Sequence, residues 1–395
     1  MRRRRLLLGT SGLAAGWLLP TGTAQAAEGW PPEVLRFVSG VQEREYLRLA
    51  DVLRLDSAKA AYDRLTERDM SPDLKQRYKS IALPTAFEDP AMYAALSITF
   101  DVLSRDAAAA DLRPLPHPYL GTLASGDVEA NTTEEPVTRT PVVFFTQGLF
   151  SIFHDMAKLM AWAAPPLSER LLTDDRALAQ IPGKYTMPPQ ASEWFANSLY
   201  GYAVRGTPIG MSTPIPEPEH NMGLAIRLVN HMERFVLAHE LAHIQEGHLS
   251  QPQSKAMEFQ ADALATILVT RLADVRHGSW AIGYWACELA LITLNFLYRT
   301  IGYFKHGDKK LSWASPTHPD PIARRAQIRG IWVQPQSPKD GVAAAREVCG
   351  MTEALLQRLW AISGDAFAEQ YLRGDRTSPR WNKALANIQA AAPSD

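Results

Sequence analysis

Apolar side chains recur every three or four residues over most of the chain, which predicts a mainly α-helical protein. This spacing predicts helices within residues 31–75, over Pro90–Ser104 and over Val342–Leu372. The run Pro141–Phe145 differs because it is apolar at every position. It either begins a buried helix or forms a short strand at the edge of a sheet. We therefore expect a mainly α fold with a small β component (α+β).

Two longer apolar segments, residues 147–163 and 279–304, raise the question of a membrane. Each carries polar side chains that share one helical face: Gln147, Ser151, His154 and Lys158 in the first, and Tyr284, Glu288, Asn295 and Arg299 in the second. Helices that face lipid rarely carry such a stripe, although helices inside a membrane bundle can. We interpret both segments as core helices with a polar seam. No transmembrane helix is expected once the N-terminal segment is removed.

Proline and glycine concentrate between residues 107 and 140, which is typical of loops and marks a boundary. We therefore divide the chain into four parts. Residues 1–26 form an export signal, and residues 27–140 form an N-terminal helical region with a Pro/Gly-rich linker. Residues 141–335 form the core that carries the chemistry, and residues 336–395 form a C-terminal helical region.

Residues 1–26 have the features of a cleavable export signal. Four arginines precede a modest apolar segment, and the small-residue pattern Ala24-Gln25-Ala26 comes directly before Ala27. The run RRRLL at residues 3–7 fits a twin-arginine signal. The sequence thus predicts an exported, periplasmic protein.

Charge and cysteine content exclude several classes of protein. The chain has 41 basic and 42 acidic residues, and outside the first arginines neither sign forms a block, so no nucleic-acid partner is expected. The two cysteines, Cys287 and Cys349, could pair in an oxidising compartment. They define neither a disulfide framework nor a metal site made of thiolates.

The candidate chemistry lies in Phe235–Leu249, FVLAHELAHIQEGHL, which contains the pattern H-E-x-x-H. His239 and His243 are four residues apart, so on a helix both imidazoles leave the same face and can bind one zinc ion. Glu240 then lies beside the metal, where its carboxylate can hold a water molecule and take its proton. Helices also contain these three residues by chance, so the assignment depends on a third ligand.

Glu258 is the candidate third ligand, because helix breakers after the first helix allow a hairpin that brings it opposite His243. Asp262 lies one turn later and is expected to accept the outer N–H of a ligating histidine. Glu288 is a rival for the third position. The alternative for Glu258 and Asp262 is an exposed pair on an amphipathic helix without a role at a metal site.

Three segments together resemble one family of zinc peptidases. HELAHIQEGH matches the longer pattern H-E-x-x-H-x-x-x-x-H, EFQADALA resembles the E-x-x-A-D ligand helix of gluzincins, and SPTHPDPIARRAQIR resembles a downstream H-P element followed by arginine. All three are similar to the gluzincin metallopeptidases that include the CaaX prenyl proteases, HtpX and the BepA-type proteases. The gap before the ligand glutamate is shorter here, as in the compact Lit-like peptidases. The resemblance covers residues 235–270 and 315–329.

This resemblance implies a zincin-like peptidase in which the H-E-x-x-H helix lies against an antiparallel third-ligand helix. It implies zinc as the cofactor, proteins or peptides of the cell envelope as substrates, and Glu240 as the general base. It also implies that His318 lies at the site. There it would either donate a hydrogen bond to the oxyanion or act as a latch, which means that it binds the open position of the zinc and keeps the enzyme inactive. A surface histidine in a proline-rich loop is the remaining alternative for His318.

Two other functions stay open from the sequence. One is a chaperone-like envelope protein whose zinc site is vestigial, and the other is a zinc hydrolase that cleaves an amide outside proteins. If residues 141–145 form an edge strand, it is a candidate for the strand against which such a peptidase would lay an extended substrate.

Overall fold

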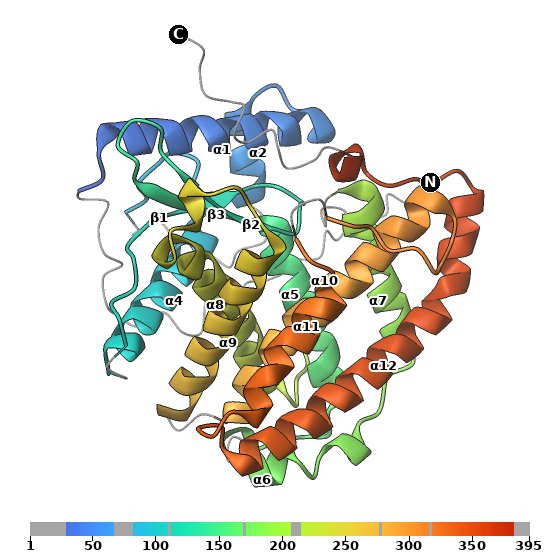
Figure 1. The fold of residues 1–395 in the computed structure, drawn as a ribbon. Coiled ribbons are helices and arrows are strands. Elements are labelled where there is room, and N and C mark those ends of the chain that lie inside the picture. Colours follow the sequence, from blue (N-terminus) through green and yellow to red (C-terminus); the bar gives the residue numbers. More distant parts are fainter. Residues whose placement is uncertain are drawn as a thin grey trace.

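The computed structural model describes residues 29–66, 82–109, 112–168, 171–206, 215–275, 279–315 and 318–382. The predicted export signal at residues 1–26 lies outside the described residues, as does the end of the helical region predicted at residues 31–75. The described residues fold mainly as helices with one small sheet, which confirms the expected mainly α class (Figure 1).

The helices account for most of the apolar periodicity of the sequence. The α-helices are α1 (Pro32–Leu53), α2 (Ala58–Thr66), α4 (Pro90–Ala109), α5 (Gln147–Ala163), α6 (Asp175–Leu178), α7 (Ala191–Tyr200), α8 (Met222–Gln245), α9 (Lys255–Val275), α10 (Trp280–His306), α11 (Pro321–Ile328) and α12 (Lys339–Leu372). The helices predicted at residues 90–104 and 342–372 are confirmed as α4 and α12. A π-helical turn, Gly201–Arg205, extends α7.

The sheet has the strand order β1-β3-β2. Strand β1 (Tyr119–Leu123) runs parallel to β3 (Pro141–Thr146), and β2 (Ala130–Glu134) runs antiparallel to β3. Of the two alternatives left open for residues 141–145, the structure has the strand and not the helix start. This strand is not an edge, because β3 lies between β1 and β2. The segment predicted as a loop at residues 107–140 instead contributes both outer strands. Its two strands have only five residues each, so the surrounding prolines and glycines dominate the pattern.

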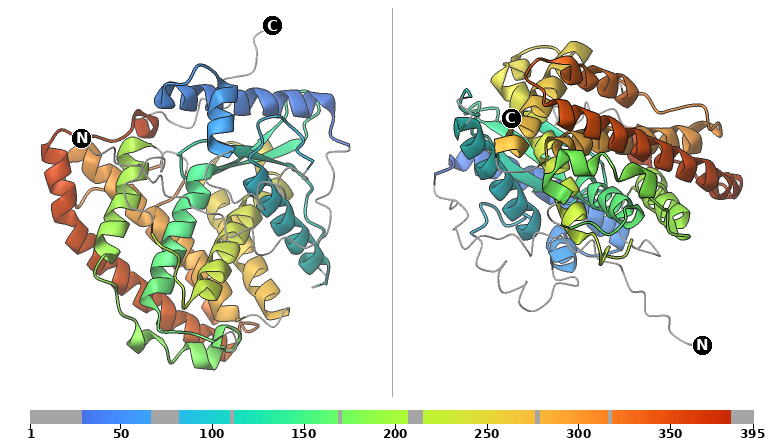
Figure 2. Two further views of the ribbon diagram at one scale, coloured as in Figure 1. Left: turned by 180° about the vertical axis from the view of Figure 1, so that it is seen from behind. Right: turned by 90° about the horizontal axis from the view of Figure 1, so that it is seen from below.

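Alternate residues of β3 pack on opposite faces of the sheet. Val142 and Phe144 belong to a cluster with apolar residues of α1, whereas Val143 and Phe145 belong to the main core. Helix α1 therefore covers one face, and the helices of the main core lie on the other (Figures 1 and 2). The site described below lies on the side of the main core.

The main apolar core is one cluster of buried side chains whose first member is Met92 and whose last is Phe367. It therefore includes residues from three of the four predicted parts. Helix α10 is buried over most of its length, and Tyr284, Glu288 and Asn295 of its polar stripe are buried with it. Among the described residues, α10 is the one helix long and apolar enough to cross a membrane, and 94% of its apolar window is buried inside the protein. Cys287 and Cys349 are both buried and are not paired.

Candidate metal centre

Helix α8 carries the H-E-x-x-H motif in its last turns. Leu237 and Leu241 are buried in the main core, which fixes the rotation of the helix and turns His239 and His243 to the other side. The helix ends just before Gly247, whose φ of 68° lies in the left-handed region that glycine adopts without a steric penalty.

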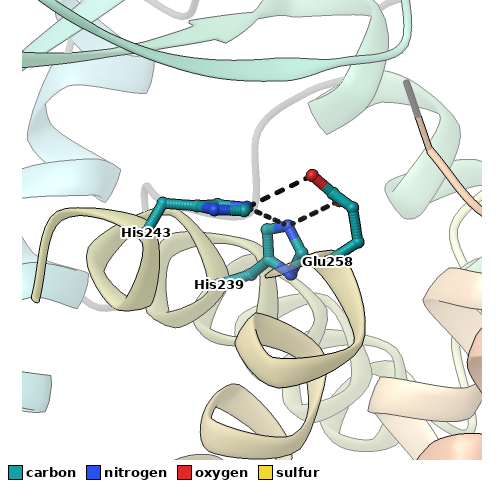
Figure 3. Close-up of side chains that lie close together, drawn as sticks. All are labelled: His239, His243 and Glu258. Carbon is teal, nitrogen blue, oxygen red and sulfur yellow. Dashed lines mark hydrogen bonds and ion pairs between the residues drawn. The ribbon is translucent and has the colours of Figure 1, made fainter. Parts of the chain in front are cut away.

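Helix α9 brings the third candidate ligand to the same place. Ser254 precedes it and accepts a hydrogen bond from the Met257 N–H at 3.4 Å, as a serine at a helix N-terminus is expected to do. Glu258 therefore lies in the first turn of α9, and it is buried. Figure 3 shows His239 and His243 of α8 and Glu258 of α9 facing one another.

The three facing side chains have the separations that one tetrahedral metal ion requires. The Nε2 atoms of His239 and His243 are 3.1 Å apart, and the carboxylate oxygens of Glu258 lie 3.4 Å and 3.5 Å from them. Zinc binds such atoms at about 2.0–2.1 Å, so two ligands of a regular tetrahedron are about 3.3 Å apart. Among the described residues, no other group of three or more His, Cys, Asp or Glu side chains has its ligand atoms all within 4.8 Å of one another.

The outer nitrogen of each histidine has a fixed partner. Asp262 Oδ1 lies 3.0 Å from His239 Nδ1, and His248 Nδ1 lies 2.9 Å from His243 Nδ1. Arg324 in turn donates to both oxygens of Asp262, each at 2.7 Å. These contacts hold both rings with their Nε2 atoms turned inward, as partners of metal-binding histidines do.

The charges of the cluster also fit a cation. Burial opposes ionisation of Glu258, but its hydrogen bond to His239 lowers its pKa to about 2. Its Oε2 atom is buried and lies 3.4 Å from the Nε2 atoms of both His239 and His318. Burial and the neighbouring charge of His239 lower the pKa of His243 to about 3, which leaves the neutral imidazole that metals bind. A buried anionic oxygen beside neutral imidazole nitrogen is the donor set that zinc prefers.

His239 behaves differently because it lies between two carboxylates. Burial alone would lower its pKa, but hydrogen bonds to Asp262 and to Glu258 raise it to about 9. A positive charge is therefore favoured at the place where the three candidate ligands meet. A metal ion bound there would displace that proton, because a ligating imidazole is neutral.

Glu240 lies next to His239 on α8 and is also buried. Burial raises the pKa of its carboxyl above the usual range. Thr132 of β2 donates a hydrogen bond to its Oε2 atom. The candidate general base is therefore held by a residue of the edge strand.

His318 lies beside the ligand glutamate, with its Nε2 atom 3.4 Å from Glu258 Oε2 and its side chain 27% exposed. Two residues after it, Asp320 caps α11 by accepting a hydrogen bond from the Ile322 N–H at 2.7 Å. Burial of the ring lowers the pKa of His318 to about 4, so the imidazole is neutral at pH 7. His318 is not part of the set of three mutually close ligand atoms.

Glu288, the rival third ligand, lies in a separate ionic cluster. Its carboxylate accepts hydrogen bonds from Tyr284 at 3.0 Å, from Arg325 at 3.1 Å and from Arg329 at 2.7 Å and 2.9 Å. These partners join α10 to α11 and to the turn that follows it. Glu288 does not belong to the group of candidate metal ligands.

The structure thus brings the residues singled out from the sequence into one cluster: His239, Glu240, His243, Glu258, Asp262 and His318. Sequence reasoning missed two contacts of this cluster. The contact of His248 could have been found, because His248 ends the pattern H-E-x-x-H-x-x-x-x-H. Thr132 is separated from its partner by 108 residues, and no local pattern marks it.

No protein-family model, curated protein or solved structure matches the chain.

Proposed function

We propose that this protein is a zinc-dependent endopeptidase of the gluzincin type. The observation that carries the proposal is the spacing of 3.1–3.5 Å among the inward atoms of His239, His243 and Glu258. This spacing suits one tetrahedral zinc ion, and Glu240 lies beside it on the same helix. Hydrolases that use this ligand set leave the fourth position of the metal for water or substrate.

The chain's own residues would carry out the proton transfers. His239, His243 and Glu258 would hold a zinc ion, which when bound polarises the scissile carbonyl and acidifies the attacking water. Glu240 takes the proton of that water and returns it to the leaving amine. Burial raises the pKa of Glu240, which makes its carboxylate a stronger base. The neutral ring of His318 is available to donate to the oxyanion.

The substrate we propose is an extended stretch of a protein or peptide. Strand β2 is an edge of the sheet, packs against α8 and is half-buried along its whole length. The outer main-chain groups of such a strand can bind an extended peptide by adding a strand to the sheet. The predicted export signal would place both the enzyme and its substrates in the cell envelope.

Metal analysis combined with digestion assays tests this proposal. The purified protein is expected to bind one zinc ion per chain and, when loaded, to cleave members of a peptide library. Glu240→Gln should retain zinc but lose about 10²–10⁴-fold in rate, because an amide cannot take the proton. Hydrolysis of the variant at the wild-type rate would show that Glu240 is not the base.

The same assays separate the other two functions. Zinc binding without hydrolysis of any substrate would indicate a vestigial site in a chaperone-like protein. Hydrolysis of a cell-wall amide with no cleavage of peptides would indicate a non-peptide substrate. A chain that binds no zinc at all would contradict the proposal.

A further inference from the structure

The hydrogen-bond register of the sheet fixes which residues of β2 turn their main chain outward. Next to one end of β2, the Thr146 N–H donates to the Glu129 C=O at 3.2 Å, and next to the other end the Glu135 N–H donates to the Thr140 C=O at 2.9 Å. In an antiparallel pair, residues that bond to the partner strand alternate with residues that do not. The odd-numbered positions of β2 therefore bond to β3. The even-numbered positions, including Thr132, turn their N–H and C=O groups to the outer edge.

Within the part of the chain that the structure describes, no strand pairs with that outer edge. Strand β2 packs against α8 and against the 3₁₀ turn His248–Ser250, which contains the partner of His243. A peptide that adds to the outer edge would therefore run beside the H-E-x-x-H helix. The main-chain groups of Thr132 would be among its partners.

The side chain of the same residue contacts the candidate base. Thr132 Oγ1 donates to Glu240 Oε2, across the interface between β2 and α8. Threonine is branched at Cβ, so its side chain has few rotamers and the hydroxyl keeps a fixed direction on a strand. A hydroxyl held in this way orients one oxygen of the carboxylate and leaves the other, Glu240 Oε1, for the water.

We propose that Thr132 is a positioning residue that joins substrate binding to proton transfer. Its main chain binds an extended peptide at the outer edge of β2, and its hydroxyl orients the carboxylate of Glu240. This inference rests on the proposed peptidase function and adds to it a residue outside the sequence motifs. A peptide bound along the outer edge of β2 would thereby restrict the position of β2, whose Thr132 hydroxyl holds Glu240.

Thr132→Val tests the proposal, because it removes the hydroxyl while it keeps the branched shape and the main chain. We expect kcat to fall about tenfold, which corresponds to about 1.4 kcal/mol, while KM for a peptide substrate stays unchanged. Thr132→Ser should restore most of kcat because it keeps the hydroxyl. Thr133→Val is the matched control, since its side chain leaves the opposite face of β2 and its main chain bonds to β3.

A second measurement needs no activity. In the metal-free protein, the effects of Thr132→Val and Glu240→Gln on the free energy of unfolding should not add, since both remove the same contact. Additive effects would overturn the proposal. So would an unchanged kcat in Thr132→Val, a Ser variant as impaired as the Val variant, or a raised KM with normal kcat.

The outcomes distinguish this inference from the proposed function. If the zinc-loaded wild type cleaves no peptide, the peptidase function fails, while the unfolding measurements still report on the contact between Thr132 and Glu240. If the wild type is active and the Thr132 variants match it, only the inference fails. Should Thr132→Val not fold, the comparison of Thr132→Ala with Thr132→Ser makes the same test.

Discussion

Replacing Asp262 with alanine is expected to damage both the stability of the protein and its affinity for zinc. The Asp262 carboxylate is fully buried, and Arg324, its partner at two distances of 2.7 Å, is only 6% exposed. Asp262 also lies 3.0 Å from the outer nitrogen of His239. The substitution therefore leaves a buried guanidinium without its anion and a candidate ligand without its orienting partner.

The size of each effect can be derived from these contacts. Removing one partner of a buried ion pair costs about 3–5 kcal/mol, because the remaining charge is buried and uncompensated. That is a large part of the roughly 5–15 kcal/mol by which a folded domain is stable. Loss of the orienting partner of a metal-binding histidine weakens metal binding by about 10–100-fold. We therefore expect Asp262→Ala to have a greater effect on folding than on zinc affinity.

Urea unfolding of the metal-free protein measures the first effect, and competition with a zinc chelator measures the second. Burial opposes ionisation of Asp262, but the charge of Arg324 outweighs it and holds the pKa of Asp262 below its ordinary range. The stability that depends on the ionised carboxylate is therefore present above about pH 4 and is lost as the pH falls further. The difference between wild type and variant should shrink in the same direction.

Two further variants make the test decisive. Asp262→Ala combined with Arg324→Met removes both charges, so it should be more stable than Asp262→Ala alone. Glu33→Ala is the control, since it breaks the exposed pair with Arg36 and should change stability by less than about 1 kcal/mol. The reasoning is refuted if Asp262→Ala costs no more than this control, or if the double variant is no more stable than the single one.

Three more predictions concern other carboxylates and His318. Glu258→Ala should abolish or greatly weaken zinc binding, whereas Glu288→Ala should leave the zinc stoichiometry unchanged, because Glu288 binds arginines instead; metal analysis with the opposite ranking would contradict the assigned ligand set. His318→Ala is expected to lower kcat by about 100-fold, the effect of losing one donor to an oxyanion; a rise in kcat would identify His318 as a latch, and no change would contradict both roles. Burial raises the pKa of Glu88 to about 7, so the folded protein holds this proton more tightly than the unfolded chain does. Stability should therefore fall by about 3 kcal/mol as the pH rises from about 4.5 to 7, and Glu88→Gln should remove most of this slope in unfolding measurements made across that range.

The parts of the site that follow from local helix geometry could be predicted from the sequence. The four-residue spacing of His239 and His243 places them together on any helix, and the same spacing relates Glu258 to Asp262. The helix breakers between the two segments allowed a hairpin to be expected. The structure adds the distances that make these residues one cluster.

Contacts across long stretches of chain could not be predicted in this way. The hydroxyl of Thr132 reaches Glu240 only because β2 pairs with β3 and the sheet packs on α8. Strand β2 has the sequence ANTTE and lies between prolines and glycines, so its five residues show no clear strand pattern. The order of strands in a sheet depends on their pairing, so the sequence alone does not show that β2 and not β3 forms the edge beside α8.

The ion pair between Asp262 and Arg324 joins residues that are 62 positions apart, and this distance has a consequence during synthesis. A ribosome that adds about 5–20 residues per second would reach Arg324 roughly 3–12 s after Asp262. In that interval the growing chain contains the three candidate ligands but lacks the arginine that neutralises Asp262. The ion pair that holds Asp262 against His239 can therefore form only late in translation, after α8, α9 and α10 have been made.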